Sequence, residues 1–293
     1  MFIIFLLKLL SKVPLRLLYL LSDFIAFVAI HLVKYRKKVV LENLRKSFPE
    51  KKEDEISTIA VNFYKHLADV VVETIKAISI SKEEITERVE IRNLEIVEHY
   101  ASQNQSVLVL TTHQCNWEWM LLSGCVQFPC AVDAVYLPLN NKRMDEFMYK
   151  ARSRFGGTPI SAKKIIKETI RRTRERTIAI GMLADQEPPA IKSRYWTTFL
   201  NQETAFVLGP QQLSGVAKMP VLFMGMERVK RGYYRVTIDK VAEPPYEKGN
   251  HDILETYIKK TEVLINANPS NWLWSHRRWK RKRPVNIDQN QIK

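Results

Sequence analysis

The sequence predicts an α/β fold in which a mixed sheet is flanked by helices and preceded by an apolar N-terminal helix. From Val89 onward, short β-branched apolar runs alternate with longer helical segments, which is typical of α/β domains. The stretch before Val89 shows helical spacing instead. A G-x-G-x-x-G or Walker A motif is absent from the sequence, so a nucleotide-phosphate loop is not indicated.

We expect residues 1–38 to form a membrane-associated segment and residues 39–293 to form the main domain. The apolar run Leu17–Val33 spans 17 residues. As a helix it would be about 25 Å long, shorter than a bilayer core of about 30 Å. Basic residues flank it on both sides, as at anionic headgroups: Lys8, Lys12, Arg16, Lys34, Arg36, Lys37 and Lys38. A cleaved signal peptide and a buried core helix are the alternatives, and spanning versus interfacial placement stays open.

The remaining elements follow from apolar periodicity. The segments Val39–Phe48 and Asp54–Ser79 have helical spacing and are interpreted as packing elements. The candidate strands are Val107–Thr111, Ala131–Tyr136, Thr177–Met182, Val221–Arg228 and Tyr233–Val241. The candidate helices are Trp117–Val126, Lys142–Phe155, Lys163–Arg174, Ala205–Ala217 and Ile253–Asn266. Binding sites in such sheets gather at the C-terminal ends of strands.

Charge and cysteine content restrict the partners. The chain has 46 Lys and Arg against 31 Asp and Glu, a net charge of +15, which favours nucleic acid, an anionic membrane or an acidic protein. The three cysteines, Cys115, Cys125 and Cys130, have no disulfide-framework spacing and indicate reduced thiols in the cytosol. They do not complete a metal site with His113, and we expect no metal or cofactor.

The first candidate site is the turn from His113 to Glu118. His113 follows the strand Val107–Thr111, and Asn116 is a plausible N-cap for the helix that begins at Trp117. Glu118 would lie in the first turn of that helix, whose N-terminus favours an ionised carboxylate. A carboxylate can hold one ring nitrogen of a histidine and leave the other free to take a proton. We therefore predict that His113 and Glu118 form a catalytic pair, although the same residues often stand in ordinary loops.

Two further strand ends supply polar candidates. Tyr136 ends a strand and precedes a helix that contains Arg152 and Arg154. One of these arginines is expected to face the site and hold a phosphate or an oxyanion, and the other to face solvent. Asp185 ends the next strand and could hold that arginine or a substrate hydroxyl, or simply cap a turn.

The C-terminal region combines aromatic and basic residues. The segment Trp196–Leu200 reads as an aromatic turn, followed by a helix start at Glu203–Ala205. Further on, basic residues and tryptophans are interleaved between Trp272 and Arg283. We expect Arg277, Arg278 and Lys280 to form a surface for a membrane or substrate. Single-stranded nucleic acid and a solvated tail are the alternatives.

Four blocks in this order resemble the late acyltransferases of lipid A biosynthesis, the lauroyl and myristoyl transferase type. They are His113-x4-Glu118, Tyr136-x-Pro138 with its downstream arginines, Asp185-Gln186, and Trp274-x-His276-Arg277-Arg278-Trp279-Lys280. The N-terminal apolar helix and the segment Asn43–Pro49 resemble the family as well. Leu137 stands where the family often has Arg, and Asn201 where it often has Gly. Both departures concern the substrate pocket more than the reaction class.

The resemblance implies a glycerolipid-acyltransferase-like α/β domain at the cytoplasmic face of a bacterial inner membrane. It implies transfer of a fatty acyl group from acyl carrier protein to a hydroxyl of a lipid A precursor, without nucleic acid as a partner. Coenzyme A as the donor stays open. A lysophosphatidate or other lysolipid acyltransferase is the alternative enzyme, although such enzymes usually have Asp in place of Glu118. A non-catalytic basic protein that binds membranes or nucleic acid is the alternative of another class.

Overall fold

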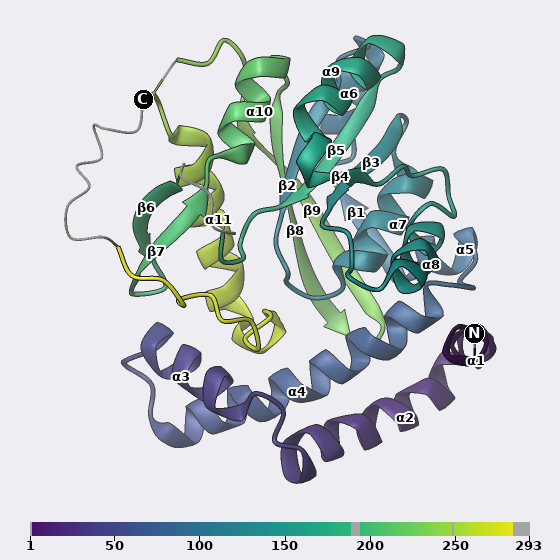
Figure 1. The fold of residues 1–293 in the computed structure, drawn as a ribbon, viewed down its shortest axis with the longest axis vertical. Helices are drawn as coiled ribbons and strands as arrows, with labels where there is room; N and C mark the ends of the chain where they lie inside the picture. The colour runs from purple at the N-terminus through teal and green to yellow at the C-terminus, as the bar shows by residue number, and fades with distance from the viewer. Residues whose placement is uncertain (1, 189–193, 248, 284–293) are drawn as a thin grey trace.

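A mixed α/β sheet forms the centre of the molecule (Figure 1). The computed structural model describes residues 2–188, 194–247 and 249–283, so residue 293, the predicted end of the main domain, lies outside them. The strands of the main sheet are β1 (Val89–Arg92), β2 (Val107–Thr111), β3 (Ala131–Tyr136), β4 (Ile160–Ser161), β5 (Ile178–Leu183), β8 (Val221–Lys230) and β9 (Tyr233–Ala242).

The strand order in the described residues is β1-β9-β8-β2-β5-β3-β4. Only β8 and β9 pair antiparallel in this described sheet, and the other neighbours pair parallel. This arrangement confirms the predicted mixed sheet flanked by helices. All five candidate strands are found, with end residues that differ slightly, and the short edge strands β1 and β4 are additional.

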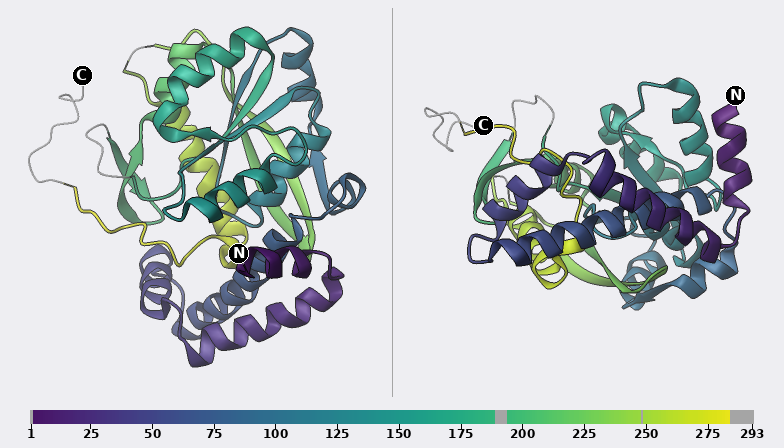
Figure 2. Two further views of the ribbon diagram at one scale, coloured as in Figure 1. Left: turned by 45° about the vertical axis from the view of Figure 1, so that its right-hand side comes forward. Right: turned by 90° about the horizontal axis from the view of Figure 1, so that it is seen from below.

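Helices cover both faces and one end of the sheet (Figures 1 and 2). They are α1 (Phe2–Ser11), α2 (Leu15–Phe27), α3 (Lys37–Ser47), α4 (Glu53–Lys76), α5 (Lys82–Arg88), α6 (Glu95–Ser102), α7 (Trp117–Gln127), α8 (Lys142–Arg152), α9 (Ile165–Glu175), α10 (Gly209–Ala217) and α11 (Asp252–Ala267). The predicted helices Val39–Phe48 and Asp54–Ser79 correspond to α3 and α4.

The central strand β2 divides the core into two apolar clusters. All five of its residues are buried, because neighbouring strands lie on both sides and helices cover both faces. Leu108 and Leu110 belong to one cluster, whereas Val107 and Val109 belong to the other. This alternation follows from the two-residue repeat of a strand, which points successive side chains to opposite faces.

The N-terminal segment packs on α4, on the side away from the sheet (Figure 2). Helix α2 continues as a π-helical turn over Val28–Leu32. The stretch Leu15–Leu32 is long and apolar enough to cross a membrane by length and composition, and only 22% of it is buried. Leu20 and Phe24 are 66% and 62% exposed. This exposed apolar face is available to a membrane, in agreement with the expected association.

One segment was predicted wrongly. The strands β6 (Arg194–Phe199) and β7 (Gln202–Val207) form an antiparallel hairpin where an aromatic turn and a helix start were predicted. Leu200 and Asn201 make its two-residue turn with φ of 49° and 61°, the left-handed geometry that such hairpins require. Helix α10 begins only at Gly209. The cross-strand pairing overrides the local helical spacing at Ala205.

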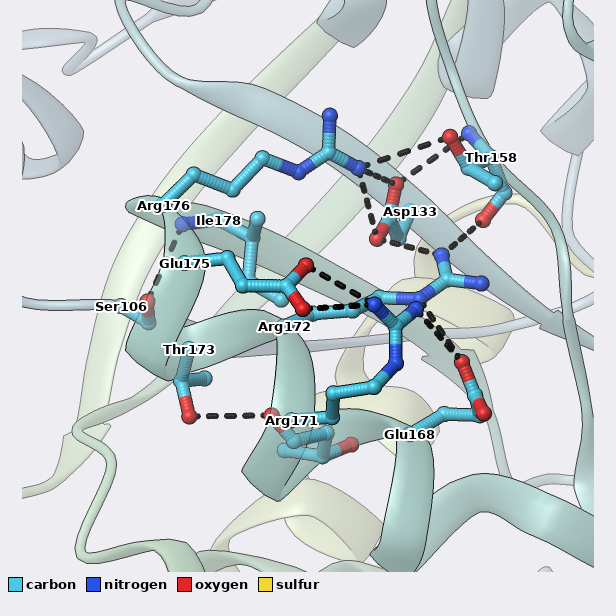
Figure 3. A network of polar contacts seen from close by, with 11 residues as sticks. Ser106, Asp133, Thr158, Glu168, Arg171, Arg172, Thr173, Glu175, Arg176 and Ile178 are labelled. Carbon is cyan, nitrogen blue, oxygen red and sulfur yellow. Dashed lines mark hydrogen bonds and ion pairs between the residues drawn. The ribbon is translucent and has the colours of Figure 1, made fainter.

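A buried carboxylate anchors β3 to α9 (Figure 3). The side chain of Asp133 is fully buried and accepts hydrogen bonds from Arg172 at 2.8 Å and Arg176 at 3.1 Å. The backbone N–H of Thr158 donates to it at 3.2 Å. Since these partners satisfy the buried charge, we interpret the cluster as structural.

Candidate active site

The site is built where β2 and β5 end side by side. Thr111 lies opposite Leu183 in the parallel register of these strands. His113 and Asp185 each stand two residues beyond that pair. Because parallel neighbours end at the same edge of a sheet, the register brings the two side chains together. The strand end predicted for His113 is confirmed, and Asp185 follows the neighbouring strand.

Asp185 orients His113. Its Oδ1 lies 2.7 Å from Nδ1 of His113, and its Oδ2 accepts the backbone N–H of His113 at 2.8 Å. Trp272 donates its Nε1–H to the same Oδ2 at 2.8 Å. A carboxylate at Nδ1 places the ring proton there and leaves Nε2 free to accept another. His113 is partly accessible, with 18% of its side chain exposed, whereas Asp185 is fully buried.

Asp185 stays ionised despite its burial. Burial by itself raises the pKa of this carboxyl group, but the charge of His113 and the hydrogen bonds from His113 and Trp272 outweigh it. The pKa of Asp185 therefore lies below its usual range. A permanently charged carboxylate favours the positively charged form that His113 takes after accepting a proton.

No hydrogen bond joins the described residues Glu118 and His113, and Glu118 pairs with Arg152 instead, which corrects the predicted pairing. Glu118 lies in the first turn of α7, as expected, and its oxygens accept hydrogen bonds from Nε and Nη2 of Arg152 at 2.9 and 2.5 Å. Arg152 is the last residue of α8, so this ion pair joins two helices. The physical reason is position: α7 turns Glu118 toward the end of α8, while the sheet register places Asp185 beside His113.

The second arginine, Arg154, lies inside the predicted helix Lys142–Phe155 but beyond the end of the observed helix, and outside the site. Helix α8 ends at Arg152, so Arg154 is not part of it. The Arg154 guanidinium donates hydrogen bonds to the carbonyl oxygens of Ala77 (Nη1) and Ile80 (Nη2), which follow α4. One arginine was predicted to face the site and the other to face solvent. Arg152 does lie against Glu118, whereas Arg154 is hydrogen-bonded to backbone carbonyl groups instead of extending freely into solvent.

Tyr136 stands at the edge of this arrangement. It ends β3, as predicted, and its ring packs edge to face against Tyr149 of α8, with centroids 6.3 Å apart. Burial and the nearby charge of Asp145 raise its pKa. Tyr136 is close enough to Arg152 for the two to interact electrostatically. The structure thus places Tyr136 near the Glu118–Arg152 pair, without a direct hydrogen bond to it among the described residues.

An apolar cavity of about 840 Å³ begins beside these residues. Its lining comes mainly from α2, α4 and α8, and includes Phe24, Leu67 and Phe147. Trp117 and Glu118 also line it. The Trp117 ring lies edge to face with the His113 ring at 5.1 Å. Pockets of this volume with few polar groups hold mostly apolar molecules, so the histidine stands next to a compartment suited to a hydrocarbon chain.

One arginine of the C-terminal basic block is part of the core, which corrects one surface assignment. Arg278 is 0% exposed, contacts Glu187 at 3.4 Å and donates to the carbonyl oxygen of Ala205 at 2.7 Å. Burial lowers its pKa to about 10, which still leaves it charged at neutral pH. Arg277 and Lys280 are exposed, as predicted. Among the described basic residues from Arg277 to Arg283, Arg278 alone is buried.

Two residues that support the site, Glu73 and Trp272, were not predicted from the sequence. Glu73 of α4 is fully buried and accepts hydrogen bonds from Asn116 at 2.7 Å and from Tyr19 and Tyr234. Asn116 in turn caps α7 through the backbone N–H of Trp119, which confirms the predicted N-cap. Glu73 thus supports the helix start that presents Glu118. Neither Glu73 nor Trp272 lies near His113 in sequence, so no local pattern could signal them.

The cysteines and acidic residues assemble no metal site in the described part of the chain. Cys115 is buried and the other two cysteines are half-buried, and none forms a disulfide. No group of three or more His, Cys, Asp or Glu side chains within residues 2–188, 194–247 and 249–283 could hold a metal ion.

The family of the chain follows from a whole-length match. The family model for bacterial lipid A biosynthesis acyltransferases matches residues 1–281. The chain therefore belongs to this family, as the ordered motifs indicated, and is an acyltransferase of lipid A synthesis. A comparison with curated proteins found no matching sequence.

Proposed function

We propose that this protein transfers a fatty acyl group from an acyl carrier protein thioester to a hydroxyl of a lipid A precursor. The observation that supports this reaction best is the His113–Asp185 pair next to the apolar cavity. A hydroxyl needs a base to become a nucleophile, and an acyl chain needs an apolar compartment close to that base.

The reaction requires one proton to move twice. Nε2 of His113 takes the proton of the acceptor hydroxyl while its oxygen attacks the thioester carbonyl. An ester C–O bond forms, the C–S bond breaks, and the proton passes from His113 to the departing thiolate. Asp185 holds Nδ1–H and stabilises the charged imidazole between these steps. We therefore assign the orienting role to Asp185 instead of Glu118.

Glu118 and Arg152 serve the substrate side of the site in this proposal. Their two hydrogen bonds fix both groups, and Glu118 lines the cavity. A paired guanidinium retains a further N–H face for a phosphate or hydroxyl oxygen. Tyr136 lies close by. The donor and acceptor are both anionic, which suits a chain with a net charge of +15.

The site is proposed to work at the cytoplasmic face of the inner membrane. The exposed apolar residues of α2 and the basic residues Arg277 and Lys280 support contact with an anionic bilayer. Residues of α2 also line the cavity, so a lipid chain could enter from the membrane side. Burial of Trp272 and Trp274 leaves Trp279 as the partly exposed tryptophan of this block, so the aromatic surface that single-stranded nucleic acid would stack on is small.

The deciding experiment offers purified enzyme one acyl thioester and two acceptors. Acyl carrier protein thioester is supplied with either a bis-phosphorylated lipid A precursor or lysophosphatidate, and products are identified by mass spectrometry. Acylation of the lipid A precursor supports the proposal. Acylation of lysophosphatidate alone would replace it with the lysolipid alternative. Parallel reactions with a coenzyme A thioester determine which donor the enzyme prefers.

A further inference from the structure

The geometry points to His276 as a second catalytic residue, whose Nδ1–H stabilises the oxyanion of the acyl-transfer intermediate. This inference rests on the proposed function, since it concerns the same reaction. His276 belongs to the C-terminal block, whose arginines and lysine were the expected functional residues. Its side chain lines the same cavity as Glu118 and Trp117.

The backbone around His276 is firmly held. Asn43 of α3 donates from Nδ2 to the carbonyl oxygens of both Trp274 and His276 at 2.9 Å. The backbone N–H of His276 donates to Leu273 at 3.1 Å. A side chain fixed in this way loses little freedom when a substrate binds, which is what preorganised stabilisation of a transition state requires.

The ring has one defined tautomer. Nε2 of His276 lies 3.0 Å from the backbone N–H of Glu187, which can only donate. Nε2 must therefore be unprotonated, and the ring proton of neutral His276 sits on Nδ1. Nδ1 has no hydrogen bond within the described residues and is not among their buried polar atoms without a partner. Because His276 lines the cavity, we infer that its Nδ1–H is the polar group that the ring offers to a molecule there.

The ring also stays neutral. Burial is the main cause that lowers the pKa of His276 to about 4, and the nearby positive charges of Arg278 and Arg36 act in the same direction. Asp185 acts in the opposite direction, with a smaller effect than the burial. At neutral pH His276 is therefore a hydrogen-bond donor and not a second base, so it does not compete with His113 for the hydroxyl proton.

The site needs such a donor. A tetrahedral intermediate places negative charge on the former carbonyl oxygen, and acyl-transfer enzymes meet it with fixed N–H groups. Nε and Nη2 of Arg152 already donate to Glu118. The N–H of Trp119 at the start of α7 donates to Asn116. His276 is held by Glu187, two residues after the Asp185 that holds His113, so the Nδ1–H of His276 is a donor from the same strand end.

A pair of substitutions separates catalysis from structure. The amide of asparagine reaches about as far as Nδ1, whereas the amide of glutamine reaches about as far as Nε2. His276→Asn keeps a donor toward the cavity, and His276→Gln keeps an acceptor for the N–H of Glu187. We expect His276→Gln to lower kcat by about 10²-fold, as for loss of one oxyanion donor, with little change in KM. His276→Asn should retain more activity than His276→Gln.

The opposite order would overturn the inference: full kcat in His276→Gln with loss in His276→Asn identifies the Glu187 contact as the important one. Nuclear magnetic resonance of ¹⁵N-histidine-labelled enzyme supplies a readout independent of turnover. A ring protonated on Nε2, or a charged ring at neutral pH, also rejects the proposal. The variants are compared with whichever acceptor the wild type acylates. If the wild type does not acylate the lipid A precursor, the proposed function is rejected. The inference about His276 can still be tested with the other acceptor, because every acyl transfer forms this oxyanion.

Discussion

His113 shares a carboxylate partner with a tryptophan from the far end of the chain: Asp185 accepts from both His113 and Trp272. The partner residues lie 72 and 87 positions from Asp185. The base, its orienting carboxylate and the indole that fixes this carboxylate therefore come from three separate segments. This relationship makes the function of Asp185 testable apart from that of Glu118.

Replacing Asp185 by Asn should preserve the shape of the site and remove its charge. The amide can donate to Nδ1 of His113, which would put the ring proton on Nε2 and block the base. We expect kcat to fall by about 10²–10⁴-fold, measured as acyl transfer under saturating donor. Glu118→Gln gives a comparison within the site: its carboxylate pairs with Arg152, so this change should act on KM and leave the Asp185–His113 hydrogen bond in place. Equal kcat in Asp185→Asn and the wild type would contradict the assigned role.

Arg152 and Arg154 offer a comparison of two neighbouring arginines. Arg152→Lys loses one of the two hydrogen bonds to Glu118, because an ammonium lacks the planar fork of donors. A loss of about 10- to 100-fold in kcat/KM is expected, equivalent to one charged hydrogen bond. Arg154→Lys should leave kcat/KM close to the wild-type value, since Arg154 contacts only backbone oxygens of Ala77 and Ile80. A larger effect at Arg154 would reverse the assignment.

Glu73 should make stability depend on pH. Burial raises its pKa from 4.5 to about 6, against the hydrogen bonds from Tyr234, Asn116 and Tyr19. Between these values the folded state binds more protons at Glu73 than the unfolded state does. The free energy of unfolding should therefore fall as pH rises through this window, by about 2 kcal/mol.

Glu73→Gln removes this titration, so the difference in unfolding free energy between wild type and variant isolates it from other groups. Denaturant unfolding at pH 4.5 and pH 6.5 provides the measurement. The wild type should lose about 1.5 kcal/mol relative to Glu73→Gln over this range, most of the full linkage. Parallel pH dependences in the two proteins would show that Glu73 keeps its ordinary pKa.

The C-terminal basic block contains both exposed and buried basic residues, so charge reversal should have different effects at the two kinds of position. The double variant Arg277→Glu, Lys280→Glu should weaken binding to anionic vesicles, with an effect that salt diminishes, and should leave stability nearly unchanged. Vesicle sedimentation and thermal unfolding measure the two properties. Arg278→Glu makes a similar charge change in the core and should destabilise the fold by about 3–5 kcal/mol. Unchanged vesicle binding in the double variant would make Arg277 and Lys280 a solvated surface.

Local apolar periodicity predicted most helices and the central strands. It failed where contacts between distant segments determine the secondary structure or the burial of a residue. The segment Ala205–Leu208 has helical neighbours in sequence, yet β6 pairs with β7 and draws Ala205 into a strand. A hairpin turn of Leu200 and Asn201 lacks the Asn-Gly or Gly-Gly signal that usually marks such turns. Similarly, the basic composition near Arg278 predicts exposure, whereas burial there depends on Glu187, Ala205 and Phe206.

The sequence by itself determined that His113 ends a buried strand, that Asn116 caps the following helix and that Glu118 begins it. These are consequences of short-range apolar spacing and capping chemistry. Only the tertiary structure decided which carboxylate serves the histidine. Glu118 is five residues from His113 but projects toward Arg152, while Asp185 is 72 residues away and lies beside it. The physical reason is the parallel register of β2 and β5, which depends on contacts along the whole sheet and leaves no signal at either residue.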